Sequence, residues 1–181
     1  MNRAANLLQA EHEIIINAVG LISEAGVFIG KDCSRYEKTV KELIYFYRNY
    51  ADKYHHYKEE IVLFPEMGRK NELLDNGVIK EMFEHHEDFR NMLSVAEQLL
   101  EKSDYEGCGK QLRMYAEAIL DHIAVENDEL FQMLETVFDN EEINRIYFRF
   151  EDIDRDLGVD EKHRMEENIN RLILETTSIR Q

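Results

Sequence analysis

Hydrophobic residues recur at intervals of three and four along most of the chain. Two such runs are Tyr36, Val40, Leu43, Ile44 and Tyr47, and Leu112, Tyr115, Ile119 and Ile123. This spacing places the apolar side chains on one face of an α-helix, while polar residues occupy the opposite face. The pattern therefore predicts a chain built from amphipathic helices.

The residues that interrupt helices are scarce. The chain has one proline and eight glycines, whereas a sandwich or barrel of short strands needs turn residues every 8–12 positions. An all-α fold is therefore expected. The interruptions divide the chain into helices at about 4–27, 35–64, 77–103, 109–136, 140–157 and 160–178.

Sequence signals mark the ends of some of these helices. Ser34 with Glu37, and Asp139 with Glu142, have the spacing of N-terminal capping boxes. Pro65 is expected to end the second helix, because proline lacks the amide proton that an α-helix requires.

Four long helices joined by short links pack most simply as an up-down antiparallel four-helix bundle, here with two additional C-terminal helices. We expect the bundle to occupy residues 1–138 and a helical extension to occupy 139–181. The extension has an apolar stripe that includes Ile143, Ile146 and Phe150. Packing against the bundle is the simpler interpretation, and a homodimer or partner interface is the alternative.

The overall charge excludes several partners. Lys and Arg number 22 and Asp and Glu number 38, which gives a formal net charge of −16. Nucleic acid and anionic membranes are not expected to bind, and the apolar runs are too short to span a bilayer. The N-terminal region does not resemble a signal peptide.

The two cysteines form no disulfide framework, so we expect a cytoplasmic, reducing location. Cys33 and Cys108 fall in or beside links at the same end of the expected bundle. They are either ordinary reduced thiols or a redox-responsive pair.

A motif with chemical content occurs twice. His55 to Phe64 and His122 to Phe131 both fit H-x-x-x-E-x-x-x-L-F. Residues four apart share a helix face, so His55 projects with Glu59 and His122 projects with Glu126.

The other two long helices each add one inward histidine. His12 lies on the same face as Leu8 and Ile15, and His86 lies on the same face as Met82 and Phe89. The inward set is His12, His55, Glu59, His86, His122 and Glu126.

Two buried carboxylates need positive charge, and the sequence offers few inward cations. Arg48 and Arg90 are the best candidates. A pair of metal ions would balance both carboxylates, and imidazole with carboxylate suits iron, manganese or zinc. A single core histidine is usually structural, but four with two glutamates favour a metal site.

Neighbouring polar residues are assigned to the rim or surface. His56, His85 and Glu60 lie one residue from the inward faces, a rotation of about 100° on an α-helix. His163 lies in the extension and is expected to be solvated.

Four blocks of the sequence resemble the hemerythrin-like family, also called the HHE cation-binding domain. They are Glu11-His12-Glu13, His55-His56-x-Lys58-Glu59-Glu60-x-x-Leu63-Phe64-Pro65, His86-Glu87-Asp88-Phe89-Arg90 and His122-Ile123-x-x-Glu126-x-x-x-Leu130-Phe131. The resemblance covers about residues 4–136. It implies a four-helix bundle that holds two non-haem iron ions, with an oxo or hydroxo bridge, through the six residues of the inward set. Manganese or zinc would be substitutes. Arg90, four residues after His86, favours His86 over His85 as the ligand.

The chain departs from the dioxygen carriers of that family. Those proteins have two histidines one turn apart on the third helix, whereas Met82 and Arg90 flank His86 here. They also have an aspartate, at a longer spacing, where this chain has Glu126. The ligand set is more similar to that of iron-centre repair proteins, although their additional cysteine-bearing N-terminal domain is not expected here.

Two functions follow from the resemblance. The first is binding or sensing of a small ligand or oxidant, such as dioxygen, nitric oxide or peroxide. The second is a stress-response diiron enzyme that reduces peroxide or nitric oxide or donates iron, with an external redox partner. A metal-free interaction module is a third class, disfavoured by Glu59 and Glu126. The expected pocket walls are Leu8, Met82, Phe83, Phe89, Tyr115 and Ile119. Tyr115 either donates a hydrogen bond to a bound ligand or packs in the core.

Overall fold

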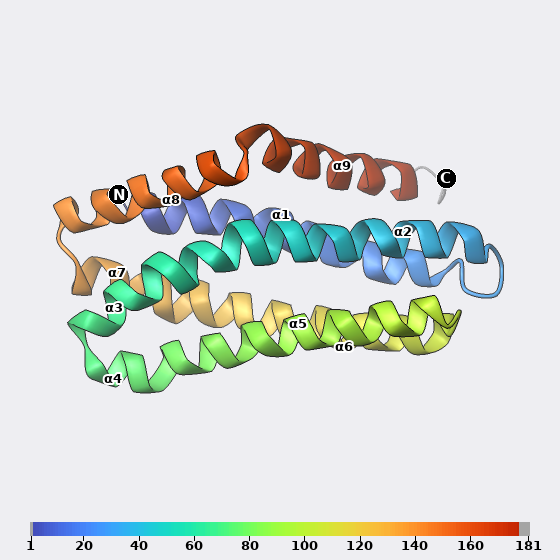
Figure 1. The fold of residues 1–181 in the computed structure, drawn as a ribbon, viewed down its shortest axis with the longest axis horizontal. Helices are drawn as coiled ribbons and strands as arrows, with labels where there is room; N and C mark the ends of the chain where they lie inside the picture. Colours follow the sequence, from blue (N-terminus) through green and yellow to red (C-terminus); the bar gives the residue numbers. More distant parts are fainter. Residues whose placement is uncertain (1, 178–181) are drawn as a thin grey trace.

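The structure, a computed structural model, describes residues 2–177, and all regular secondary structure in this range is helical. The prediction of an all-α fold is confirmed. Four long helical segments run antiparallel as a bundle, with a helical pair laid along one side (Figure 1).

The helical segments follow one another in chain order. The first is α1 (Arg3–Gly26). The second comprises α2 (Cys33–Phe46), η1 (Tyr47–His56), η2 (Glu59–Leu63) and α3 (Phe64–Lys70). The third comprises α4 (Glu72–Leu74), η3 (Asp75–Ile79) and α5 (Lys80–Glu101). The fourth comprises α6 (Tyr105–Val125), η4 (Glu126–Leu130) and α7 (Phe131–Val137). The added pair is α8 (Asn140–Leu157) and α9 (Val159–Thr177).

Four stretches of these segments are π-helical, with wider turns than an α-helix. They are η1, η2, η3 and η4, of which η3 is interrupted by a kink at Gly77, where φ is −108° and ψ is −112°. Three of them contain or adjoin the H-x-x-x-E motifs: η1 ends at His56, η2 begins at Glu59 and η4 begins at Glu126. π-Helical turns are uncommon and are often found at functional sites.

The helix ends agree with the sequence in one place and differ in two. Asp139 and Glu142 form the expected capping box at the start of α8. At the start of α2 the cap is Asp32, whose side chain accepts a hydrogen bond from the Arg35 amide, and the prediction of a Ser34 cap is wrong. Asp32 precedes the helix, whereas Ser34 lies inside its first turn.

The expected helix end before Pro65 is also wrong, since the chain stays helical to Lys70. Pro65 lies in the first turn of α3, directly after the π-helical η2, where a missing amide proton is tolerated. The carbonyl of Ile61, four residues before Pro65, lies 3.4 Å from the guanidinium of Arg149, which donates a hydrogen bond to it.

The apolar interior is divided into two clusters by a polar layer. One cluster includes Ile15, Phe89 and Ile119, and the other includes Leu8 and Met82. His12 and His86 therefore lie, along their own helices, between residues of the two clusters.

The C-terminal pair packs along the bundle beside α1 (Figure 1). Ile146 and Phe150 of α8 belong to one apolar cluster, and Met165 and Ile169 of α9 belong to the other. The pair therefore contacts the apolar clusters on both sides of the polar layer. The division of the chain into two parts after residue 138 stays a prediction.

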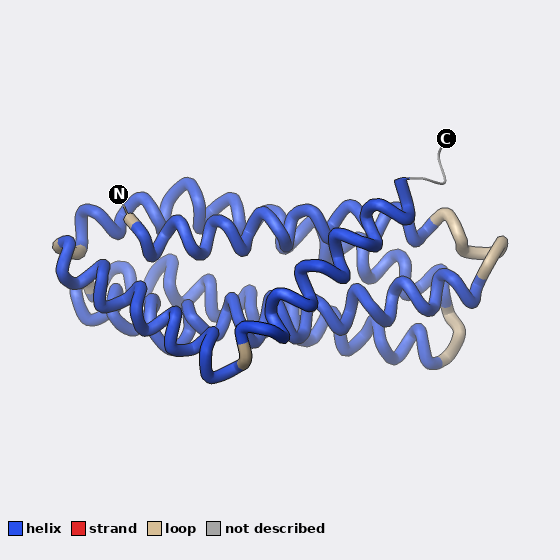
Figure 2. Tube along the Cα trace, turned by 90° about the horizontal axis from the view of Figure 1, so that it is seen from above, coloured by secondary structure: helices blue, strands red, loops and turns tan. Residues whose placement is uncertain are grey.

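A sharp turn joins α8 to α9 (Figure 2). Gly158 has φ +102°, a conformation that side-chain-bearing residues rarely adopt. The hydroxyl of Tyr54 donates hydrogen bonds to the carbonyls of Leu157 and Gly158, at 2.9 and 2.8 Å. These contacts fix the turn against η1.

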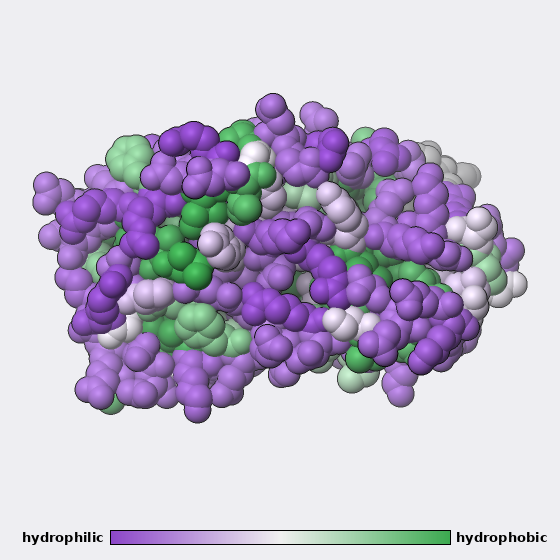
Figure 3. All heavy atoms as spheres, in the orientation of Figure 1, coloured by the Kyte–Doolittle hydropathy of each residue, from purple (hydrophilic) through white to green (hydrophobic). Residues whose placement is uncertain are grey.

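The molecular surface agrees with the acidic composition. The face in Figure 3 is mainly hydrophilic, and hydrophobic residues show as patches among the hydrophilic ones. Among the described helices, none combines the length and the apolarity needed to cross a bilayer.

Candidate metal centre

Seven side chains from all four long helical segments meet in the polar layer. They form two groups, His56, Glu59, His86 and His122 in the first and His12, His55, Glu59 and Glu126 in the second. Within each group one nitrogen or oxygen atom per residue lies within 4.8 Å of every other, and all seven residues are buried. Each group has the atom types and separations to hold one metal ion.

The two glutamates link the groups. Glu59 directs Oε1 at the Nε2 of His55, 3.5 Å away, and Oε2 at the Nε2 of His86, 3.6 Å away. Glu126 Oε2 lies 3.2 Å from the Nε2 atoms of both His12 and His122. Carboxylates placed between two groups in this way can bridge two cations.

The structure brings together all six residues that were proposed from the sequence, and it adds His56. The assignment of His56 to the rim is wrong: the side chain is 3% exposed and belongs to the first group. A π-helical turn holds more residues than the 3.6 of an α-helix, so consecutive residues are separated by less than 100°. His55 and His56, at the end of η1, therefore both reach the interior.

Most of the histidines contact an oxygen atom through the ring nitrogen that faces away from the centre. Nδ1 of His12 lies 3.1 Å from Asn127 Oδ1, Nδ1 of His55 lies 3.0 Å from Glu11 Oε2, and Nδ1 of His86 lies 2.8 Å from Glu60 Oε1. A proton on Nδ1 would be donated to each of these oxygens. Nε2 is then left with its lone pair, directed at the centre, as a metal ligand requires.

Buried atoms of the layer lack ordinary partners. Both oxygens of Glu59, both oxygens of Glu126 and the Nε2 atoms of His12 and His55 accept or donate no hydrogen bond within the described part of the protein. Such atoms are costly to bury. Their shared direction toward one small volume fits bound cations.

The pKa shifts of the buried residues in the layer also favour bound cations. Burial, followed by the neighbouring charges of Glu126 and Glu11, raises the pKa of Glu59 well above its ordinary value. Burial and the nearby His12 lower the pKa of His55 to about 3, and burial and His56 lower that of His86 well below normal. His55 and His86 are therefore neutral near pH 7, so these two imidazoles do not balance the carboxylates.

The cations of the sequence are engaged elsewhere. Arg48 contacts Glu97 and Ser94, whereas Arg90 contacts Asp52 and Glu60. Neither reaches Glu59 or Glu126, and no other described Lys or Arg makes an ion pair with them.

Four other expectations can be compared with the structure. Glu60 lies off the inward face, yet it contacts His86 and is a positioning residue that the sequence missed. His85 is 35% exposed and His163 is 65% exposed, as expected of rim and surface residues. Phe83 is 40% exposed and is not a wall of the centre. The other expected wall residues are buried: Leu8, Met82, Phe89, Tyr115 and Ile119.

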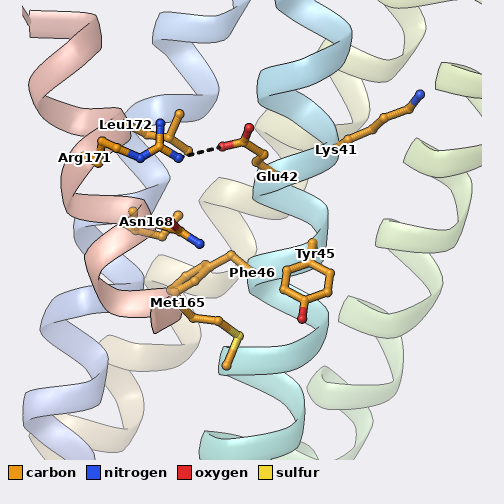
Figure 4. Close-up of a pocket in the computed structure, with 9 residues that line it drawn as sticks. Lys41, Glu42, Tyr45, Phe46, Met165, Asn168, Arg171 and Leu172 are labelled. Carbon is orange, nitrogen blue, oxygen red and sulfur yellow. Dashed lines mark ion pairs between the residues drawn. The ribbon is translucent and has the colours of Figure 1, made fainter. Parts of the chain in front are cut away.

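A hollow of about 380 Å³ lies away from this centre, between α2 and α9 (Figure 4). Tyr45, Phe46 and Met165 line it, and Arg171 pairs with Glu42 across it at 3.7 Å. None of the seven grouped residues lines this hollow, so it is separate from the centre.

The fold and the polar layer define a class of protein, a helical bundle with cation-binding groups of histidine and glutamate inside it. The family model "Hemerythrin HHE cation binding domain" matches residues 3–134. The chain belongs to this family. Comparison with curated proteins gave no match, and comparison with solved structures gave none.

Proposed function

We propose that the protein is a non-haem dinuclear iron protein that binds or senses a small ligand or oxidant, such as dioxygen, nitric oxide or peroxide. The observation that carries the proposal is the pair of adjacent His/Glu groups that share Glu59. Imidazole and carboxylate ligands suit iron, with manganese and zinc as substitutes.

The chemistry of the donor set supports two cations rather than one. Glu59 and Glu126 together carry two negative charges when ionised, and no described Lys or Arg pairs with them. One divalent ion in each group would remove the cost of burying both carboxylates. We propose His12, His55, Glu59, His86, His122 and Glu126 as ligands, with His56 as a further nitrogen donor.

The protein's own residues would prepare the centre for its metals. Glu11, Glu60 and Asn127 hold three imidazoles with Nε2 facing inward, and the apolar clusters on both sides exclude water. A bound iron pair would supply positions for an incoming small molecule and a change of oxidation state.

The space beside the first group supports a ligand of very small size. A cavity of about 10 Å³ is lined by His56, Phe89, Tyr115 and Tyr47, among others, and such a volume holds about one water molecule. Among the described residues the hydroxyl of Tyr47 has no hydrogen-bond partner, and burial raises its pKa above the ordinary tyrosine value. It therefore keeps its proton and is free to donate it in a hydrogen bond to a small guest.

Metal analysis of protein purified without oxygen tests the proposal. Two iron ions per chain are expected, and their visible spectrum should disappear in the Glu59→Gln variant. A chain that takes up no metal in excess iron, manganese or zinc would refute the proposal.

Rapid mixing of the reduced iron-loaded protein with oxygen, nitric oxide or peroxide separates binding from catalysis. A reversible adduct supports binding or sensing. Irreversible oxidation with repeated turnover would instead assign the alternative, a stress-response enzyme.

We propose a cytoplasmic location, which the two free thiols support. We also propose that the protein forms a homodimer or acts with a redox partner.

A further inference from the structure

A second buried polar cluster lies directly behind His55. It consists of Glu11, Lys58, Asp154 and Lys162, with exposed fractions of 4, 0, 14 and 12%. Glu11 comes from α1, Lys58 lies between η1 and η2, Asp154 comes from α8 and Lys162 comes from α9. We call it the four-charge cluster.

The cluster is closed and electrically balanced. Each lysine contacts both carboxylates: Lys58 lies 2.6 Å from Glu11 and 2.5 Å from Asp154, and Lys162 lies 2.5 Å from Glu11 and 2.7 Å from Asp154. Two positive and two negative charges sum to zero. The cluster therefore needs no metal ion of its own, in contrast to the layer that contains Glu59 and Glu126.

The carboxylate group of Glu11 connects the cluster to the metal centre. Both lysines contact Oε1 of Glu11, while Oε2 of the same carboxylate lies 3.0 Å from Nδ1 of His55. The lysines thus hold the carboxylate in the orientation that accepts a hydrogen bond from the Nδ1–H of His55. That hydrogen bond fixes the ring of His55 with Nε2 toward Glu59.

Half of the cluster comes from outside the family match. The match ends at residue 134, whereas Asp154 and Lys162 belong to the C-terminal pair. We propose that α8 and α9 are a positioning device for the metal centre, in which Asp154 and Lys162 act through Glu11 on His55.

The effect is expected to be asymmetric. His55 belongs to the group with His12 and Glu126, whereas Glu60 and Asp52 lie behind His86 and His56 of the other group. Loss of the cluster should weaken one of the two metal positions more than the other. This inference rests on the proposed dinuclear centre.

The test is anaerobic titration with ferrous ions in competition with a chelator, which reports an affinity for each position. The variant is Asp154→Asn with Lys162→Gln, which leaves Glu11 and Lys58 as a balanced pair. We expect a loss of about tenfold at the position that includes His55, the low end of the effect of residues behind metal ligands, and little change at the other position. The control is Asp152→Asn with Arg155→Gln, an exposed ion pair on the same α8 helix.

Each outcome has one meaning. Two metals in the wild type with unchanged affinities in a folded variant would overturn the positioning role alone. No metal in the wild type would overturn the proposed function. An equal loss at both positions would overturn the asymmetry and, with it, the route through His55.

Folding of the variant is checked by a cooperative thermal transition. If the double variant shows no cooperative transition, the single variant Lys162→Gln replaces it, and the same two metal affinities are measured. The single variant is expected to fold because solvent reaches the side chain of residue 162, which is 12% exposed. Glu11→Gln gives a second reading, because a glutamine that no longer attracts two lysines should weaken the same position by about 10- to 100-fold.

Discussion

At the residue scale, the chain uses two arrangements of buried charge. Glu11 and Asp154 are neutralised by two lysines, whereas Glu59 and Glu126 face only histidines. Burial works against the charge of Glu11, but the hydrogen bond with His55 and the charges of Lys58 and Lys162 lower its pKa well below normal. In the metal centre the two glutamates shift in opposite directions: burial and the charge of Glu126 raise the pKa of Glu59, whereas burial opposes the charge of Glu126 but His122 and His12 lower its pKa well below normal.

Replacement of Glu59 by glutamine should change stability in opposite directions with and without metal. The raised pKa of Glu59 means that folding is opposed at every pH above about 4.5, where the unfolded chain releases its proton more easily. We expect metal-free Glu59→Gln to be more stable than the wild type by about 1–4 kcal/mol near pH 7, with the difference vanishing as the pH falls toward 4.5.

Urea unfolding of chelator-treated protein between pH 4.5 and 8 measures this difference. Glu13→Gln, the same change at an exposed position of α1, should alter the unfolding free energy by less than about 0.5 kcal/mol. A metal-free Glu59→Gln protein that is less stable than the wild type near pH 7 would contradict the argument.

The two thiols should react at different rates. Cys33 is exposed, whereas Cys108 is buried and burial raises its pKa. We expect one thiol to react quickly with a colourimetric disulfide reagent and the second to react slowly until the protein is unfolded. Equal rates in the native protein would contradict the burial of Cys108. A protein without free thiols would contradict the unpaired state of both cysteines.

At the scale of the helical element, wide turns explain why the sequence misplaced one residue. A strict α-helical period puts His55 and His56 on different faces, but η1 has π-helical turns up to His56. The hydrophobic period does not reveal this local change, because the buried apolar residues of η1 still recur at intervals of three and four: Tyr47, Tyr50, Ala51 and Tyr54. Consecutive histidines at the end of a buried helix are the one signal that could have indicated it.

The capping box of α8 should contribute measurably to stability. Asp139 accepts a hydrogen bond from the Glu142 amide at 2.8 Å and its own amide donates to the Glu142 side chain at 3.1 Å. Asp139→Ala should cost about 1 kcal/mol and lower the melting temperature by about 2–4 °C. In a differential scanning experiment, Asp152→Ala on the exposed face of α8 should have a much smaller effect; equal effects would exclude a capping role.

At the scale of the whole molecule, the metal centre joins all four long helical segments. Two apolar clusters pack on either side of the polar layer, and the C-terminal pair contacts both clusters. Cations bound at the centre would therefore hold together every long segment of the bundle, and metal binding would be coupled to global unfolding.

Iron should raise the melting temperature. At a free metal concentration one hundred times the dissociation constant, one site adds about 2.7 kcal/mol, or roughly 5–11 °C for a protein of this size. Thermal scans with ferrous ions and without oxygen measure the shift. Magnesium at the same concentration controls for non-specific binding to the acidic surface, and an equal shift with magnesium would contradict an internal site.

The sequence by itself determined the helices, their order in a bundle and six residues that converge. The helices could be predicted because hydrophobic periodicity is a local property of the chain. The converging residues could be predicted because the H-x-x-x-E motif occurs on two inward helix faces. Only the tertiary structure decided the rest. The inward position of His56 depends on a π-helical turn, and the contacts of Glu60 with His86 depend on how two helices pack. Glu11 and Lys162 are 151 positions apart in sequence, yet they meet in the structure. No periodicity records such a contact, since it arises when elements from distant parts of the chain bury their polar groups together.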